Sequence, residues 1–403
     1  MDKNVTIENR SVPTRLKLLF LAADESNFWF HRLAVARAAR DAGAEVIVMT
    51  RLGQYHSLLE QEGFRIIPWR ISRRSLGPVQ EVLTFFEVLS AYRREEPQLV
   101  HHVALKAIIY GGAAAVFCGE IPAVNAVAGL GRVFTISTPA MLILRRVLSI
   151  VLRWVFEASN CRVTLENDDD RDLLVTEKII APAKTVVIPG VGIDTEYFSP
   201  RPEPDGIPVV MLPSRMLWEK GVAQFVEAAG ELREKGVSAR FVLVGAPDLE
   251  SRGYIPESQL RSWADTEIVE WWGTRDDMPA VLGKAHVVCL PSYYREGIPR
   301  VLIEASACGR AIVTTNAPGC RQVVRQGENG LLVPVRDARA LAAAIFSLLQ
   351  NPKLREQMGS AGRARAVHEF SQDKIVRQTF DVYRALLDQM WPASIPVTSV
   401  EQL

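Results

Sequence analysis

The 403-residue sequence has few of the features that mark several large protein classes. Its five cysteines are widely spread and form no Cys-x-x-Cys pair, so we expect buried thiols in a reducing compartment rather than disulfides or a zinc site. The net charge of +1 argues against bulk capture of nucleic acid. Walker A, Gly-x-Ser-x-Gly and His-Glu-x-x-His motifs do not occur, which removes the familiar signatures of NTPases, serine hydrolases and zinc proteases.

Long hydrophobic runs are also missing. Residues 1–15 are polar and contain no apolar core of signal-peptide length. The most apolar stretch, residues 141–156, is interrupted by Arg145, Arg146 and Arg153 and is shorter than the ~20 residues of a spanning helix. We therefore expect a cytoplasmic protein. The stretch itself suits either a core helix with snorkelling arginines or an amphipathic helix peripheral on the cytoplasmic face of the inner membrane.

What is present is an ordinary globular composition, with 48% hydrophobic and 23% charged residues, in a chain long enough for two domains. In the first half, apolar runs alternate with helical segments at about 30–42 and 79–94. This rhythm predicts a doubly wound parallel sheet. The expected strands are residues 16–22, 45–50, 65–69, 99–103 and 123–127.

A second α/β unit follows a proline- and glycine-rich linker at 188–208. We expect an α/β protein of two Rossmann-like domains, residues 1–188 and 189–371, with a last helix at about 372–392 packing back on the first. Ligands of open α/β sheets bind at the carboxyl ends of the strands, so those ends should line a cleft between the domains. The expected strands of the second unit are 209–213, 241–245, 268–273, 287–291 and 311–315, with helices starting near 219, 276 and 299.

Residues 291–304, PSYYREGIPRVLIE, are the densest chemical signal. A strand ends at Pro291, and Pro299 stands where a first helical residue would. The unpaired N–H groups of that helix start form an anion site. Glu296 precedes the helix and Glu304 lies about 7–8 Å further along it, so the two can span sugar, diphosphate and ribose. The spacing alone equally suits a surface Glu296 and a Glu304 that only decorates a helix.

A basic pair lies at the same edge of the predicted sheet. Arg215 follows the first strand of the second unit, and Lys220-Gly221 opens the next helix. Two such cations can neutralise a leaving diphosphate without a metal. A solvated basic turn would have the same sequence, but coincidence with the glutamate pair on one sheet edge favours a phosphate site.

These residues together resemble a known family. Arg215-x4-Lys220-Gly221, Glu296-Gly297 and Glu304 are similar to the donor-site signature of retaining GT-B glycosyltransferases of family GT4, and the match continues at residues 309–313 and 329–333. The resemblance covers essentially the whole chain. It implies the GT-B architecture and a sugar nucleotide, expected to be UDP-linked, as donor substrate, with neither a metal nor another cofactor.

The resemblance also assigns roles in the donor site. Arg215 and Lys220 would hold the diphosphate, Glu296 the hydroxyls of the transferred sugar and Glu304 those of the ribose, so that Arg215, Lys220 and Glu296 form the catalytic set. Ile298-Pro299 stands where the commonest sequence is Phe-Gly, which removes one N–H from the phosphate cradle. The remaining donor-binding residues would be Gly297, Ile298, Pro299 and Arg300 near the phosphates, and Gly273, Thr274 and Arg275 beside the base.

The first half resembles the bacterial GT4 branch that extends saccharides on polyprenyl diphosphate. Cations near its strand ends are what an acceptor diphosphate would need. Val103 replaces a histidine that many GT4 members carry, so no first-domain residue is assigned to the transferred sugar. The sequence leaves the oligomeric state open. The expected acceptor-binding residues are Asp24, His31, Arg32, Arg73, Arg74, His101, Lys106, Gly129, Gly131 and Arg132.

Other patterns support weaker interpretations. Asp168, Asp169 and Asp170 follow a strand-like segment, and we expect them to cap a helix rather than bind a metal. Gly129-x-Gly131 lacks the rest of a dinucleotide fingerprint. Three alternatives remain open: a GT-B-like sugar-nucleotide epimerase, a glycosidase using two carboxylates, and a non-catalytic partner in a glycosylation complex. The basic pair and the helix-start cradle favour a phosphate leaving group over the glycosidase.

Overall fold

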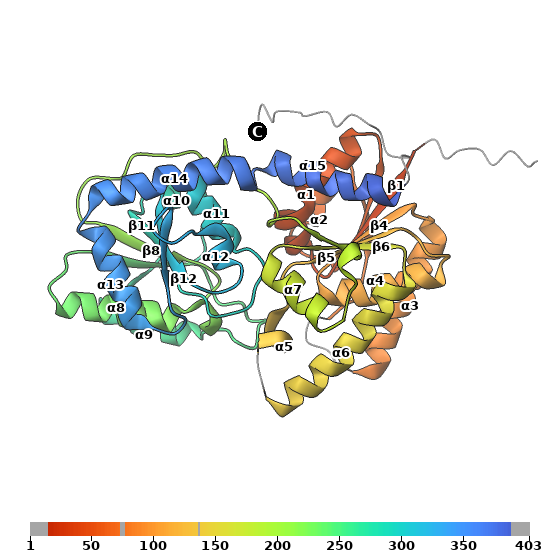
Figure 1. The fold of residues 1–403 in the computed structure, drawn as a ribbon, viewed down its shortest axis with the longest axis horizontal. Coiled ribbons are helices and arrows are strands. Elements are labelled where there is room, and N and C mark those ends of the chain that lie inside the picture. Colours follow the sequence, from red (N-terminus) through yellow and green to blue (C-terminus); the bar gives the residue numbers. More distant parts are fainter. Residues whose placement is uncertain (1–14, 73–76, 136–137, 388–403) are drawn as a thin grey trace, which may run out of the picture.

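The computed structural model describes residues 15–72, 77–135 and 138–387, which form two α/β domains (Figure 1). The first contains a seven-stranded parallel sheet in the order β3-β2-β1-β4-β5-β6-β7. Its central strands are apolar runs buried on both faces, as expected where helices cover both sides of a parallel sheet. The strands are β1 (Lys17–Ala22), β2 (Glu45–Thr50), β3 (Arg65–Pro68), β4 (Leu99–Val103), β5 (Ala123–Val127), β6 (Cys161–Leu165) and β7 (Thr185–Val187).

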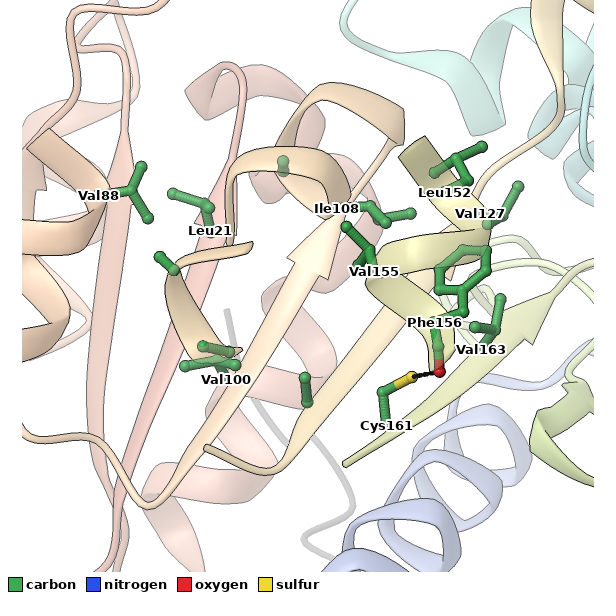
Figure 2. Packing of buried hydrophobic residues seen from close by; sticks show 14 of the residues in the cluster. Leu21, Val88, Val100, Ile108, Val127, Leu152, Val155, Phe156, Cys161 and Val163 are labelled. Carbon is green, nitrogen blue, oxygen red and sulfur yellow. Dashed lines mark hydrogen bonds between the residues drawn. The ribbon is translucent and has the colours of Figure 1, made fainter. Parts of the chain in front are cut away.

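Helices cover both faces of this sheet. The helices α3, α4 and α6 pack on one face, where Val88, Ile108 and Val155 meet the strands (Figure 2). Helix α1 begins five residues before the predicted position because Asp24 accepts a hydrogen bond from the Asn27 N–H at 2.7 Å. The helices are α1 (Glu25–Asp41), α2 (His56–Gln61), α3 (Pro78–Glu95), α4 (Leu105–Phe117), α5 (Gly131–Thr135), α6 (Pro139–Ala158) and α7 (Asp168–Thr176).

The second domain has a six-stranded parallel sheet in the order β10-β9-β8-β11-β12-β13. The strand predicted at 268–273 is only two residues long, and β13 was not predicted as a strand. The strands are β8 (Val209–Pro213), β9 (Arg240–Val244), β10 (Glu270–Trp271), β11 (Val287–Leu290), β12 (Ala311–Thr315) and β13 (Gly330–Val333). The helices are α8 (Val222–Glu234), α9 (Glu257–Asp265), α10 (Met278–Gly283), α11 (Arg300–Ala307), α12 (Cys320–Val323), α13 (Ala338–Leu349) and α14 (Pro352–Phe370).

The chain crosses between the domains twice, at neighbouring positions. The Ile193 N–H donates to the Phe370 carbonyl at 3.0 Å, and the Gln372 N–H donates to the Ile193 carbonyl at 2.9 Å. Beyond this point α15 (Gln372–Leu386) continues the direction of α14 and lies against the first domain (Figure 1). Its buried Phe380 and Tyr383 join the core between the first sheet and α1. Helix α15, the last described element, therefore contributes to the core of the amino-terminal sheet.

Candidate active site

The loop between β11 and α11 holds Glu296 from two sides. Ser292 Oγ donates a hydrogen bond to Glu296 Oε1 at 2.8 Å, and Lys220 Nζ forms an ion pair with Glu296 Oε2. The two side chains of this pair are only 11% and 16% exposed. Separating such charges would leave each one poorly solvated, so the pair is expected to keep its geometry. Glu296 is therefore a fixed carboxylate at the carboxyl edge of the second sheet.

Lys220 reaches this loop because its own turn packs onto the loop's first residues. It ends a short 3₁₀ helix, η2 (Trp218–Lys220), and Gly221 follows with a φ of 76°. A Cβ atom at Gly221 would lie 2.1 Å from the carbonyl oxygen of Pro291, an approach that only glycine permits. The Lys-Gly pair and the Glu-Gly pair of the sequence are thus two halves of one packed unit.

Positive charges from both domains act on His31 of α1. The pKa of His31 is lowered to about 3, first by burial and then by the positive charges of Arg32, Arg300 and Arg215. Arg215 itself is half-exposed and pairs with Asp248 at 2.6 Å. A neutral imidazole among guanidinium groups leaves the positive potential intact. The region therefore suits an anion such as a diphosphate.

Glu304 lies on the wall of a cleft between the domains. It is 8% exposed and accepts a hydrogen bond from Arg300 Nε at 2.7 Å. Both residues, together with Trp29 and His31 of α1, line a cavity of about 520 Å³. Helix α11 begins at Arg300, one residue later than predicted, because Pro299 occupies the N-cap position with φ −64° and ψ 109°. The glutamate pair thus brackets the start of this helix.

Two glycines predicted for the acceptor site pack against residues 291–299, the loop between β11 and α11, which we call the glutamate loop. The Gly131 N–H donates to the Arg295 carbonyl at 3.2 Å. A Cβ atom at Gly129 would lie 2.3 Å from the backbone nitrogen of Gly297. Both glycines also have positive φ angles, of 92° and 67° for Gly129 and Gly131. Their small size allows the two domains to meet at the glutamate loop.

The segment after β6 makes the other contact with this loop. Glu166 Oε2 accepts a hydrogen bond from the Ile298 N–H at 2.6 Å. Asp170 pairs with Arg295 at 2.7 Å, and Asp169 pairs with Arg321 of the second domain. Glu166 was not predicted as a site residue, and the aspartates were predicted to cap a helix. The signal that could have found them is their position, directly after a strand at the edge that faces the cleft.

The helix cap at this place differs from the prediction. Asn167, not the aspartate run, is the N-cap of α7, and its side chain accepts a hydrogen bond from the Asp170 N–H at 2.8 Å. The three aspartates form the first turn, where negative charge is favourable near the helix N-terminus. Within the described residues no group of three or more His, Cys, Asp or Glu side chains could hold a metal ion.

The residues predicted to lie beside the base follow β10 at the cleft edge. The Gly273 carbonyl accepts a hydrogen bond from the Gly245 N–H at 2.7 Å. Thr274 is exposed, and Arg275 Nε donates to Asp277 at 2.9 Å. These side chains are accessible, and the contact with the base remains a prediction.

Several predicted acceptor residues are engaged within the first domain. Asp24 caps α1, and Arg32 is 8% exposed. His101 is 2% exposed, and its Nδ1 lies 2.6 Å from the hydroxyl of Tyr383 on α15. Lys106 Nζ donates to the Ser72 carbonyl at 2.9 Å. The structure therefore places His101 in the core rather than on the cleft wall. Arg73, Arg74 and the side chain of Arg132 lie outside the described residues.

The fold and this site define a class of protein. Residues 17–160 match the family described as glycosyl transferase 4-like, and residues 194–365 match glycosyl transferases group 1. A glycosyltransferase from Rickettsia africae is similar over 93% of this chain and 100% of its own, with a TM-score of 0.74 and 19% identity. The structure of Anabaena Alr3699/HepE in complex with UDP and glucose is similar over 92% of this chain and 100% of its own, with a TM-score of 0.74 and 20% identity. The fold is the GT-B fold.

The chain belongs to the glycosyltransferases that join a GT4-like domain to a group 1 domain. A relative from Campylobacter jejuni, N,N'-diacetylbacillosaminyl-diphospho-undecaprenol alpha-1,3-N-acetylgalactosaminyltransferase, is 26% identical over 385 residues, 91% of this chain and 98% of the relative. The putative colanic acid biosynthesis glycosyltransferase WcaL of Escherichia coli is 33% identical over 223 residues, 52% of this chain and 53% of its own length. The predicted family and architecture are therefore confirmed.

Proposed function

We propose that this glycosyltransferase moves a hexose or N-acetylhexosamine, with retention, from a UDP-sugar to a polyprenyl-diphosphate-linked saccharide in bacterial surface polysaccharide or glycan assembly. The observation that carries the donor half is the buried Lys220–Glu296 pair beside the start of α11. The acceptor half is supported by the Campylobacter relative, whose name specifies a diphospho-undecaprenol acceptor and which aligns over nearly its whole length.

In this proposal the donor diphosphate lies between Lys220, Arg215 and the backbone of residues 297–299. The bond between the sugar C1 and the diphosphate oxygen breaks, and the cations stabilise the negative charge that develops on that oxygen. The acceptor hydroxyl attacks C1 from the same face and passes its proton to the departing phosphate oxygen. Glu296 would hold sugar hydroxyls, and Glu304 would hold the ribose. Retention rests on the resemblance to family GT4.

The site requires no protein nucleophile for this path. Positioning of donor and acceptor across the closed cleft supplies much of the rate, since a well-oriented pair of reactants avoids a large entropic cost. An epimerase would instead need acid and base carboxylates, but Glu296 is committed to Lys220 and Ser292, and Glu304 to Arg300. A non-catalytic partner would have no reason to keep this arrangement.

We also propose that α6 contacts the cytoplasmic face of the inner membrane, where a polyprenyl-linked acceptor resides. Ile143, Val147, Ile150 and Trp154 form an outward stripe on α6 and are between 44% and 68% exposed. Arg146 is exposed beside them and suits anionic headgroups. Among the helices of the described residues, none is long and apolar enough to cross a membrane.

The reaction is tested by incubating the protein with radiolabelled UDP-sugars and polyprenyl-diphosphate-linked saccharides. The proposal expects UDP release with one donor and a lengthened lipid-linked saccharide, whose new linkage has the anomeric configuration of the donor. Inverted configuration would remove the retaining mechanism while keeping the transferase. Absence of product with every donor and acceptor would favour the non-catalytic alternative.

A further inference from the structure

Glu166 is a buried acid of the first domain that contacts the glutamate loop of the second. It follows β6 directly and is 8% exposed. Its Oε2 accepts the Ile298 N–H at 2.6 Å, and the same oxygen would lie 2.0 Å from a Cβ atom at Gly297. The carboxylate is thus pressed against the backbone of the two residues that the proposed function assigns to the donor phosphates.

A carboxylate and a phosphate can take the same position beside a backbone N–H. Both are anions that accept a charge-assisted hydrogen bond, and one N–H can serve only one of them well. Pro299 supplies no N–H to this segment, so the Ile298 N–H counts for more than it would in a cradle with glycine there. The Glu166 carboxylate therefore takes the hydrogen bond that the proposed function gives to the donor diphosphate.

The surroundings of Glu166 disfavour its charged form. Burial raises the pKa of Glu166 to about 7, against the opposing positive charge of Arg32 and the hydrogen bond from Ile298. Asp170 and Glu296 raise it further because they are like charges. Arg32 is 8% exposed, and its positive charge is the main influence that lowers the pKa of Glu166. The carboxylate is therefore held, but at a cost in desolvation and repulsion.

We propose that Glu166 is a built-in competitor of the donor diphosphate, which must give up the Ile298 N–H before the donor is fully bound. This inference rests on the proposed function, because it takes the Ile298 segment as the phosphate site. It makes Glu166 a positioning residue that sets donor affinity, and it ties donor binding to a change in the contact between the two domains. A purely structural Glu166 would only hold the domains together.

The two roles predict opposite effects on ligand binding. Isothermal titration calorimetry with UDP is the test, using wild type, Glu166→Gln and Asp169→Asn. Glutamine keeps the shape of the side chain but accepts a weaker hydrogen bond from the Ile298 N–H. We therefore expect UDP to bind about fivefold more tightly. Asp169 lies three residues after Glu166, and Asp169→Asn removes its interdomain ion pair with Arg321. This control should leave UDP affinity within about twofold.

Equal or weaker UDP binding by Glu166→Gln would overturn the inference. Removal of a competitor must increase the affinity for UDP, whereas removal of a purely structural contact would not. If Glu166→Gln does not fold, Glu166→Asp, whose carboxylate is one carbon shorter, should also bind UDP more tightly. The result separates this inference from the proposed function. Wild-type protein that binds neither UDP nor any other nucleoside diphosphate would overturn both, whereas wild-type binding without a gain in the variants overturns only the role of Glu166.

Discussion

Lys220 and Glu296 lie 76 residues apart in the sequence and form a buried ion pair at the carboxyl edge of the second sheet. The pair joins a cation suited to a leaving diphosphate with a carboxylate suited to sugar hydroxyls. Ser292 holds the remaining oxygen of Glu296, so the carboxylate has little freedom to rotate. Protein contacts thus fix both side chains, and fixed charges are what electrostatic stabilisation of a departing group requires.

Lys220→Ala should lower kcat by about 100-fold or more, because the variant removes a cation from the departing phosphate and leaves Glu296 without its partner. The matched control is Lys235→Ala immediately after α8, since Lys235 pairs at the surface with Glu231 of that helix at 2.6 Å. That variant should retain activity within about twofold. Steady-state release of UDP measures both. Equal activity of the two variants would show that Lys220 does not act on the phosphate.

Gly221→Ala should destabilise the protein more than Gly236→Ala, although the two glycines have φ angles of 76° and 74°. Both variants carry the strain of a left-handed residue, about 1 kcal/mol. Only at Gly221 would the new Cβ also meet the carbonyl oxygen of Pro291, whereas a Cβ atom added at Gly236 would have no such neighbour within 4 Å. Urea denaturation measures the difference, and Gly221→Ala should also lower kcat by displacing Lys220. Equal stability losses would contradict the packing of the Lys-Gly turn on the glutamate loop.

The pKa of Glu166 predicts a pH dependence of stability. Burial raises this pKa from 4.5 to about 7, so between these values the folded protein binds a proton that the unfolded chain releases. The resulting cost is absent below about pH 4.5 and complete above about pH 7, where it amounts to roughly 3 kcal/mol. Glu166→Gln should therefore gain stability relative to wild type as pH rises from 5 to 8. Thermal denaturation at both pH values measures the difference in stability between the variant and wild type. A difference that does not change with pH would contradict the raised pKa of Glu166.

The exposed stripe on α6 predicts binding to anionic vesicles. Ile150→Glu should reduce co-sedimentation with phosphatidylglycerol vesicles by about tenfold, because the variant places a charge where apolar area would be buried. Phe346→Glu is the control, since Phe346 is 42% exposed on α13 of the other domain. It should bind vesicles as wild type does. Loss of binding in both variants, or in neither, would remove α6 as the contact surface.

The sequence allowed most of the fold to be predicted because buried parallel strands are continuous apolar runs. Several strand limits, including those at 45–50, 99–103 and 209–213, agree with the structure. The start of α1 was placed too late because Phe30 looked like its first residue, whereas the Asp24 cap lies before it. The strand at 330–333 was missed because its pairing with β12 depends on the fold and not on its short apolar run.

The candidate site was only partly predictable for the same physical reason. Motif spacing placed Lys220, Glu296 and Glu304 at one edge of one sheet, and the structure brings them there. Contacts between domains leave no periodic signal in the sequence. The position of Glu166 after a strand could be read from the sequence, but its contact with the Ile298 N–H is seen only once the two sheets face each other. His101, predicted as an acceptor residue, is buried against Tyr383 of the last described helix.

The most direct test of the account is transfer of a labelled sugar from its UDP-sugar to a polyprenyl-diphosphate-linked saccharide by wild type and by the Arg215→Ala/Lys220→Ala variant. We expect transfer by wild type and a loss of at least about 100-fold in the variant, with a circular dichroism spectrum like that of wild type. Transfer at wild-type rate by the folded double variant would contradict the assignment of these two cations to the donor diphosphate.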